Sequence, residues 1–498
     1  MKIIQYILSI SFFITFVNES YSQNKLNILL ITADDLNCNT VGVYGSKVDN
    51  ITPNIDKLAS QGLRFTKAHV NVAVCAPSRG VIATGLYAHN SGLVGFSDTK
   101  KDIPTIVKTF KSEGYRCGIL GKVDHSSPKF DTPWDTKLDL KDLGMGRDKD
   151  IYYKEATKFI QESKKKNQPF YLMVNSHDPH RPFAKSDQEK KWKKYNIKDP
   201  SRIYKPNEVV VPGFLPELPE VRLEISEYYS SVRRLDDTVG RILQTLEEQG
   251  VANNTLIMFL SDNGMAFPFS KANCYLQSTN TPWLVKWPGV VKEGKVDDEH
   301  FISTVDFFPT VLEAAGIKKP ITLDGKSFVK ILNGKNQKGR KHVFTQFHET
   351  NGGNAYPIRS VQDERFGYIF NAWANGKKVF KNESQSGRSW KAMKKVANSD
   401  TTIKARVHLF ENRVLEEFYD FKNDPNALNN LIHNPKYKKE IACKRKELEK
   451  YMEKTGDFLL AAFRKRDDAQ FIKKFVAKLQ QEAKASKIER DKMKKAKK

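Results

Sequence analysis

Four short apolar segments that alternate with amphipathic helical stretches constrain the fold of this chain most strongly. The apolar segments are Ile28–Thr32, Tyr115–Leu120, Phe170–Ser176 and Leu256–Ser261. Apolar residues at three-to-four spacing predict a long helix near 219–249 that ends at Gly250, and a shorter helix runs from Pro53 to Gly62. This alternation predicts an α/β fold in which helices flank a mixed, largely parallel sheet.

The pattern changes past about residue 340, where short strand-like segments are joined by polar loops. These segments are His342–Phe347, Phe366–Phe370 and Arg406–Phe410. They predict a smaller subdomain built on an antiparallel sheet. We therefore predict a signal peptide over 1–22, an N-terminal α/β domain over 23–340, a smaller C-terminal α+β subdomain over 341–463 and a basic helical tail over 464–498.

The predicted tail carries fourteen Lys or Arg and five Asp or Glu, a net charge of +9. Phe471, Phe475 and Leu479 give it a narrow apolar stripe. Such a segment binds polyanions or an anionic membrane surface in some proteins, but a solvated helix is the favoured interpretation.

The first residues resemble a secretory signal. Lys2 supplies the positive end, Ile3 to Val17 the apolar run, and Ser20-Tyr21-Ser22 a small-residue cleavage site. The run is short for a membrane span, so cleavage is favoured over an uncleaved anchor, and no transmembrane span is expected afterwards. The mature protein is expected in the periplasm or outside the cell.

Five cysteines are present, and an odd number in an exported protein leaves at least one outside intramolecular disulfides. Cys38, Cys117 and Cys274 are expected to be small buried residues, and Cys443 to have no special role.

Polar residues follow each of the four predicted strands. They are Asp34-Asp35, then Gly121-Lys122 with His125, then His177-Asp178-Pro179-His180, and finally Asp262-Asn263-Gly264. Ligands bind at the carboxyl ends of strands in open α/β sheets, so these groups are expected to converge on one site. Turns use the same residue types, but four such strand ends in one chain favour a site.

Asp34, Asp35, Asp262 and Asn263 offer only oxygen ligands, which select a hard cation rather than zinc. Ca²⁺ is favoured outside the cytoplasm, and Mg²⁺ remains the alternative. Around this cation, Lys122, His125, His177 and Lys271 are expected to supply positive charge or hydrogen-bond donors for an oxyanion.

The segment Cys75-Ala76-Pro77-Ser78-Arg79 places a cysteine just before a predicted helix that starts at the proline. Backbone N–H groups and the helix dipole favour bound anions there. Cys75 is therefore well placed for a nucleophile that acts on an anionic substrate.

This pentapeptide is also the signature of the type I sulfatases, and other stretches of the chain resemble that family. They are Thr52–Ala59, Gly121-Lys122, Ser261–Gly264, Asp306–Thr310, Tyr419–Phe421, Asp424-Pro425 and Asn430-Leu431. The resemblance runs from about Asn27 to Leu431 and implies the core fold of the alkaline phosphatase superfamily. The heparan N-sulfatase (sulfamidase) branch is the most similar, through His177–Arg181, Phe267-Pro268 with Lys271 and Asn273, and Tyr356–Val361.

Three positions depart from the family pattern. His125 lies three residues after Lys122, a spacing closer to the iduronate-2-sulfatase branch. Lys271 stands where the sulfamidase branch has an arginine, so it offers a point charge rather than a bidentate fork. Ala83 replaces a leucine on a packing face.

The resemblance implies that a separate maturation enzyme converts Cys75 to formylglycine, whose hydrate is the nucleophile. Asp34, Asp35, Asp262, Asn263 and the modified Cys75 would hold Ca²⁺. Arg79 would fix the hydrate and His125 would accept its proton. Lys122 and Lys271 would balance the sulfate charge, and His177 or Lys271 would protonate the leaving oxygen. His180, His348 and Arg359 are candidate contacts to the substrate sugar, although a plain polar-loop interpretation of His348 and Arg359 stays open.

The resemblance therefore implies an exported sulfuric ester hydrolase that removes sulfate from a polyanionic glycan. Algal polysaccharides such as ulvan or carrageenan, and glycosaminoglycans with N- or O-sulfate, suit a formal net charge of +25. No nucleic-acid-binding motif is visible, and no nucleic-acid partner is expected. The alternatives are an N-sulfoglucosamine sulfohydrolase specifically, a phosphodiester or phosphonate hydrolase of the same superfamily, and an inactive protein that binds sulfated glycans.

Overall fold

The computed structural model describes residues 25–96, 98–100, 102–127, 133–320 and 322–496. Its main sheet has eight strands in the order β5-β4-β6-β1-β7-β8-β2-β9. The strands are β1 (Asn27–Ala33), β2 (Leu63–Phe65), β4 (Arg116–Leu120), β5 (Thr136–Leu138), β6 (Phe170–Asn175), β7 (Thr255–Ser261), β8 (Trp283–Lys286) and β9 (Lys295–Asp297). All four predicted core strands are confirmed, as β1, β4, β6 and β7.

The centre of this sheet is parallel, because β1 pairs in parallel with both β6 and β7, and β4 pairs in parallel with β5 and β6. Only β8 runs antiparallel to its neighbours β7 and β2. The carboxyl ends of β4, β6, β1 and β7 therefore meet at one edge. A short parallel pair, β3 (Ala68–His69) with β10 (Ile302–Ser303), lies outside the main sheet.

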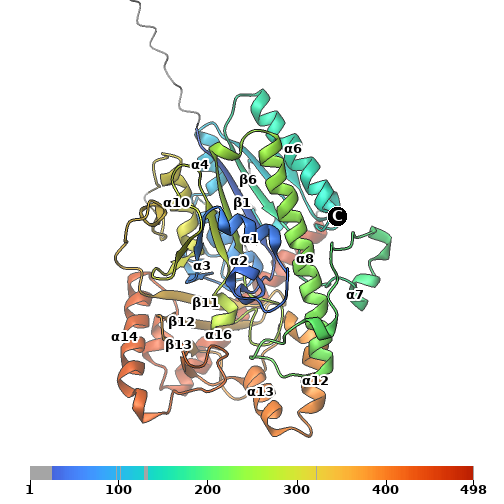
Figure 1. The fold of residues 1–498 in the computed structure, drawn as a ribbon. Helices are drawn as coiled ribbons and strands as arrows, with labels where there is room; N and C mark the ends of the chain where they lie inside the picture. Colours follow the sequence, from blue (N-terminus) through green and yellow to red (C-terminus); the bar gives the residue numbers. More distant parts are fainter. Residues whose placement is uncertain (1–24, 97, 101, 128–132, 321, 497–498) are drawn as a thin grey trace, which may run out of the picture.

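Helices cover both faces of the sheet, as Figure 1 shows. Alternate residues of β1 point to opposite faces: Leu29 and Ile31 pack under α6 and α8, and Ile28 and Leu30 pack under α4 and α10. The helices of this part are α1 (Pro53–Ser60), α2 (Cys75–Thr84), α3 (Ala88–Ser91), α4 (Ile106–Ser112), α5 (Val123–Ser126), α6 (Lys149–Lys165), α7 (Asp187–Lys190), α8 (Pro219–Glu248), α9 (Leu276–Thr279), α10 (Phe307–Ala314) and α11 (Val329–Leu332). The two predicted helices are thus confirmed as α1 and α8.

A second, antiparallel sheet follows in the order β11-β12-β13-β14. Its strands are β11 (Val343–Glu349), β12 (Ala355–Gln362), β13 (Phe366–Asn371) and β14 (Glu416–Asp420). A bridge between Val72 and Gln346 joins β11 to the segment that precedes α2. The helices that accompany this sheet are α12 (Arg388–Val396), α13 (Thr401–Asn412), α14 (Lys438–Lys454) and α15 (Leu460–Arg464).

The strand predicted at Arg406–Phe410 is wrong, because these residues belong to α13. Asp400 caps that helix by accepting a hydrogen bond from the backbone N–H of Ile403. Ile403, Val407 and Phe410 are buried at helical spacing. The β-branched and aromatic residues of this segment favour a strand, but the helical spacing of its apolar residues determines the structure.

The basic tail forms α16 (Ala469–Ala496), but it is not the solvated helix that the sequence favoured. Ile472, Val476, Leu479 and Ala483 are buried, and Phe471 and Phe475 are partly buried against the same core. The apolar stripe is thus wider than predicted and is covered by the body of the protein.

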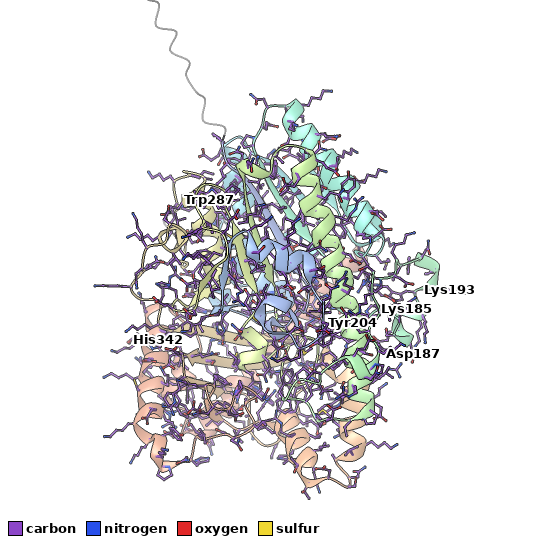
Figure 2. The ribbon with its side chains drawn as sticks, in the orientation of Figure 1. Lys185, Asp187, Lys193, Tyr204, Trp287 and His342 are labelled. Carbon is purple, nitrogen blue, oxygen red and sulfur yellow. The ribbon has the colours of Figure 1, made fainter. Side chains whose placement is uncertain are left out.

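The α7 segment stands away from the body beside α8, where Figure 2 shows Lys185, Asp187 and Lys193 at the edge of the molecule. Cys117 and Cys274 are buried as expected, whereas Cys38 is only partly buried, and none of the five cysteines is paired. The predicted signal peptide lies outside the described residues. In the part of the chain that the structure covers, no helix has the length and hydropathy to cross a membrane. The four domain boundaries stay predictions.

Candidate active site

The ends of β1 and β7 bring four oxygen-bearing side chains together. The backbone N–H of Asp262 donates to Ala33 O (3.2 Å), and that of Asp35 donates to Asp262 Oδ1 (3.1 Å). Asn263 Nδ2 donates to Asp35 Oδ1 (2.6 Å). Asp34, Asp35, Asp262 and Asn263 are all fully buried, so the predicted oxygen cluster exists.

The donor set of this cluster fits a divalent cation. Oδ1 of Asp34 and Oδ1 of Asn263 are buried without a hydrogen-bond partner. A buried acceptor without a partner costs free energy, so these two oxygens suit a bound cation. Ligand atoms of Asp34, Asp35 and His180 lie within 4.8 Å of one another, which places His180 beside the cluster although only oxygen ligands were predicted.

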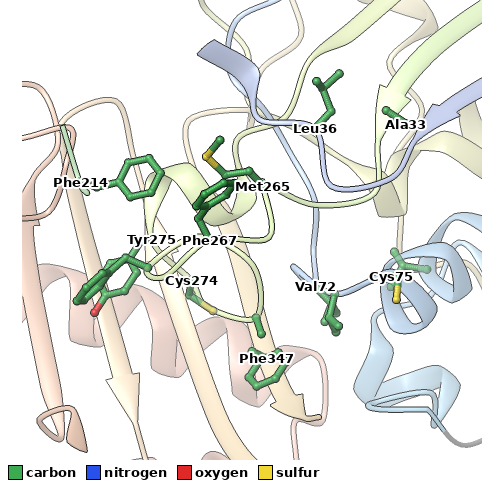
Figure 3. Close-up of a cluster of buried hydrophobic side chains, with 14 of the residues drawn as sticks. Ala33, Leu36, Val72, Cys75, Phe214, Met265, Phe267, Cys274, Tyr275 and Phe347 are labelled. Carbon is green, nitrogen blue, oxygen red and sulfur yellow. The ribbon is translucent and has the colours of Figure 1, made fainter. Parts of the chain in front are cut away.

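Cys75 is buried at the first position of α2, and Figure 3 shows it at the start of that helix. The helix begins at Cys75 rather than at Pro77 as predicted. Pro77 is tolerated there because the first N–H groups of a helix have no partner within the helix. Burial raises the pKa of the Cys75 thiol to about 12, so the unmodified thiol stays protonated near neutral pH and is a weak nucleophile.

Arg79 lies one turn further along α2 and is fully buried beneath the cluster. Its Nε donates to Asp262 Oδ2 (2.9 Å), and its Nη1 donates to Thr32 Oγ1 (2.8 Å) and Asn175 Oδ1 (2.7 Å). Asn175 also donates to Gly121 O (2.8 Å). Arg79 and Asn175 thus tie the ends of β1, β4, β6 and β7 together. Sequence reasoning missed Asn175, which no motif distinguishes.

Lys122 and His125 come from the short helix α5 that follows β4. Lys122 has a left-handed backbone (φ 53°), and its ammonium pairs with Asp34. This ion pair holds the pKa of Asp34 well below its ordinary value, against the opposing effect of burial. The helical turn of α5 brings His125 back to the site in spite of its unusual spacing from Lys122. Burial and the nearby Lys122 lower the pKa of His125 to about 3.

His177 and His180 follow β6 and share a pocket of about 260 Å³ with Lys122 and His125. Burial, with Lys122 and Arg147 nearby, lowers the pKa of His177 well below its ordinary value, and its Nδ1 has no partner. His180 Nδ1 lies 2.6 Å from Arg181 O, the distance of a hydrogen bond in which the ring N–H donates to the carbonyl. The predicted histidines therefore converge on one cavity.

Lys271 lies beside Asp35 of the cluster. The N–H of Ala272 donates to Ala73 O (2.7 Å), which fixes this loop beside Cys75. Lys271 Nζ pairs with Asp35 Oδ1 (2.8 Å) and with Glu383 Oε2 (2.8 Å). Burial alone would lower the pKa of Lys271, but the two carboxylates outweigh it and raise that pKa well above its ordinary value.

Glu383 is a site residue that the sequence analysis missed. It begins a 3₁₀ turn (Glu383–Ser386) in the C-terminal part of the chain. Besides Lys271, its carboxylate lies 3.2 Å from His180 Nε2. Glu383 and Lys271 line a second pocket of about 260 Å³, and the contact with His180 joins this pocket to the histidine pocket. Nothing in the local sequence around Glu383 signals its place in the site.

Comparison with known proteins identifies the family to which this chain belongs. The family model described as "Sulfatase" matches residues 26–317, more than half of the chain. The chain belongs to the sulfatase family. The C-terminal model of N-sulphoglucosamine sulphohydrolase matches residues 265–381, in agreement with the predicted sulfamidase-like branch. The family makes the chain a sulfuric ester hydrolase.

Three relatives illustrate the similarity of this sulfatase to known proteins. Human N-sulphoglucosamine sulphohydrolase is 30% identical over 466 residues, with 86% of this chain and 90% of the human protein covered. An ulvan-active sulfatase of Formosa agariphila is 28% identical over 441 residues, with 87% and 81% covered. A solved 2-O GAG sulfatase is 20% identical, with a TM-score of 0.66 and 89% and 94% of the chains covered, which supports the fold.

Two of the predicted sugar contacts of this sulfatase lie in the interior. Arg359 is 1% exposed, and its Nε and Nη2 are both bound to Asp457. His348 is buried with its ring edge-on to Phe458, and burial lowers its pKa to about 3. Neither lines either of the two pockets beside the cluster, so their predicted contact with the sugar requires a rearrangement.

Proposed function

We propose that this sulfatase is exported and hydrolyses sulfate groups of a sulfated polysaccharide or its oligosaccharides. It uses Ca²⁺ and a formylglycine that a maturation enzyme makes from Cys75. The observation that carries this proposal is the position of Cys75, buried at the start of α2 and one turn from Arg79, which is bound to the carboxylate of Asp262. A thiol held protonated there is a weak nucleophile, which favours its conversion to another group.

Asp34, Asp35, Asp262 and Asn263 would hold the cation together with the modified Cys75. Carboxylate and amide oxygens suit Ca²⁺, and Mg²⁺ is the alternative. The cation, when bound, offsets negative charge on the sulfate and on the attacking oxygen. His180 is available as a neighbour because its Nε2 lies 3.9 Å from Asp35 Oδ2.

Four side chains then act on the sulfate itself. Lys122 and Lys271 offset its charge, since each lies beside the cluster and pairs with one of its carboxylates. The hydrated aldehyde supplies the attacking hydroxyl. His125 is neutral in the free protein and can accept the proton of that hydroxyl. Lys271 keeps its proton in the free protein and His177 does not, so Lys271, or His177 once the charge of the bound sulfate has raised its pKa, supplies a proton to the leaving oxygen.

The proposed substrate is a sulfated glycan. Two similarities support it, one to the human N-sulphoglucosamine sulphohydrolase and one to the ulvan-active sulfatase of Formosa agariphila. The formal net charge of +25 favours association with a polyanion. The match to the C-terminal model of N-sulphoglucosamine sulphohydrolase makes an N-sulfated glucosamine the first substrate to test.

The test compares turnover of 4-nitrophenyl sulfate with that of an aryl phosphate diester, using protein co-expressed with a formylglycine-generating enzyme. The proposal expects a higher kcat/KM for the sulfate ester. It also expects loss of activity in a chelator and recovery on addition of Ca²⁺. Faster turnover of the phosphate ester would instead favour a phosphodiester or phosphonate hydrolase. Activity that survives chelation would refute the metal assignment.

A further inference from the structure

The second pocket, which Lys271 and Glu383 line, is walled by residues of the C-terminal part of the chain. The loop 350–354 after β11 forms one side, Lys381 and Asn382 form another, and Phe96 closes the edge. This pocket opens next to Cys75, since Val74 also lines it. A sugar attached to the reacting sulfate therefore has room there.

Helix α16 holds this loop from behind. Gln480 Nε2 donates to Gly353 O (2.8 Å), and the N–H of Ala355 donates to Gln480 Oε1 (3.1 Å). Arg490 Nη2 donates to Asn351 O (2.6 Å), and its guanidinium lies 5.9 Å from the ring centre of Phe96. The basic tail is thus part of the wall around the pocket.

The apolar side of α16 is covered by the protein itself, so this basic amphipathic helix cannot use that side to bind a membrane. Val476, Leu479 and Ala483 are buried in the core shared with β12 and β13. A membrane-bound helix needs its apolar face free to enter the lipid interface. Only the charged side of α16 is therefore free to contact a ligand or partner.

Two lysines stand together where α16 meets the pocket, and we call Lys378 and Lys484 the Lys378 cluster. Lys378 Nζ donates to Ala355 O and to Gln480 Oε1 and lies 4.7 Å from the ring centre of Tyr356. The hydroxyl of Tyr356 accepts a hydrogen bond from the backbone N–H of Lys381 (3.1 Å), a residue that lines the pocket.

The described residues offer no counterion to the charges of this cluster. Lys484 follows Gln480 by one helical turn, and burial together with Lys484 lowers the pKa of Lys378 to about 8. Within the described part of the chain, no carboxylate forms an ion pair with Lys378 or Lys484. Like charges held this close, one of them half-buried, disfavour each other unless an anion lies between them.

We propose that the Lys378 cluster is a subsite for a second anionic group, a sulfate or a carboxylate, on a sugar next to the one whose sulfate is cleaved. This proposal depends on the proposed function in one respect only: it assumes that the ligand is a sulfated glycan. It would make the enzyme favour oligosaccharides over monosaccharides, and α16 would be the element that supplies this preference.

The experiment measures binding by calorimetry to the Cys75→Ala variant, so that turnover plays no part. The first probe is the monosaccharide N-sulfoglucosamine. The second is an N-sulfated heparosan tetrasaccharide, in which the sugars next to the N-sulfated glucosamines carry carboxylates and no O-sulfates. The others are a heparin tetrasaccharide, which also carries O-sulfates, and an ulvan tetrasaccharide. The test variant adds Lys378→Met and Lys484→Met. The matched control adds Lys473→Met and Lys474→Met, two exposed lysines on the first turns of the same helix.

We expect the test variant to bind the tetrasaccharides about tenfold more weakly, with a smaller salt dependence, as the loss of two partly screened charges predicts. The control and the monosaccharide affinity should not change, and Lys378→Arg with Lys484→Arg should keep the affinity. A loss for heparosan would identify a carboxylate as the second anion, and a loss for heparin alone would identify a sulfate.

Two outcomes would overturn the subsite: equal affinities in the test and control variants, or an equal loss for the monosaccharide. The proposed function fails separately, if the matured wild-type protein releases sulfate from none of these saccharides. Lysine-dependent binding would then still support the subsite.

Discussion

Arg79 shows how one side chain organises the site. Its guanidinium reaches Asp262, Thr32 and Asn175, which belong to three different strand ends. A fully buried guanidinium with these partners is held rigidly, and its removal would leave the carboxylate of Asp262 buried without compensation. In our account Arg79 therefore positions the cluster.

Glu383 offers a prediction at the same scale. Its carboxylate competes with the substrate's sulfate for Lys271, so Glu383→Gln should lower the KM for 4-nitrophenyl sulfate by roughly fivefold, about 1 kcal/mol for a half-exposed pair. Steady-state kinetics on matured protein measures this change. Lys271→Met is the matched comparison and should raise the KM. An increase in KM for Glu383→Gln would show instead that the carboxylate binds the substrate or holds Lys271 in place.

Individual site residues were predictable from the sequence where they directly follow a predicted strand. Asp34, Asp35, Asp262 and Asn263 directly follow buried strands, and parallel pairing of β1 with β7 brings them together. Glu383 and Asn175 were not predictable, because the first comes from a distant loop and the second is the last residue of a strand. Arg359 belongs to a stretch that resembles the sulfamidase branch and His348 to no such motif, and Asp457 and Phe458 hold both side chains in the interior.

At the scale of elements, the end of β11 carries an acid whose titration affects stability. Glu349 is buried, and burial raises its pKa to about 7. The folded protein therefore binds a proton between about pH 4.5 and pH 7 that the unfolded chain releases, and stability falls as the pH rises through this window. The total contribution is about 3 kcal/mol.

Glu349→Gln should remove this contribution. The free energy of unfolding, measured by urea titration, should fall less from pH 5 to pH 8 in the variant than in the wild-type protein. The same pH dependence in both proteins would mean that Glu349 is ionised in the fold, paired with Arg490.

The packing of α16 gives a second prediction at this scale. Leu479 is 7% exposed in the core shared with β12 and β13, so Leu479→Ala should lower the free energy of unfolding by about 2–4 kcal/mol. Lys478→Ala changes the neighbouring exposed residue and should lie within about 0.5 kcal/mol of wild type. Denaturant unfolding measures both. If both variants match the wild-type protein, α16 does not pack as described.

Elements were predictable where their apolar period was clear. The four core strands and helices α1 and α8 follow from the apolar segments and from three-to-four spacing. The tail was misjudged because the sequence shows its stripe but not the sheet that covers it. The Arg406–Phe410 segment was misjudged because its residue types favour strands while its buried positions follow a helix.

At the scale of the whole molecule, the site lies where the two sheets meet. The parallel sheet supplies the oxygen cluster and the histidines, whereas the antiparallel sheet and the segments around it supply Glu383 and the 350–354 loop. The bridge from Val72 to Gln346 fixes the two parts to each other directly before Cys75. In the proposed function, the first part of the chain thus supplies the chemistry and the second part contributes to substrate recognition.

The most direct test of the central claim is release of inorganic sulfate from defined sulfated oligosaccharides, measured by ion chromatography. Wild-type protein and Cys75→Ala are both co-expressed with a formylglycine-generating enzyme. We predict sulfate release by the wild-type protein and none by Cys75→Ala, with the same unfolding transition in both. Sulfate release that persists in the Cys75→Ala variant would contradict the account.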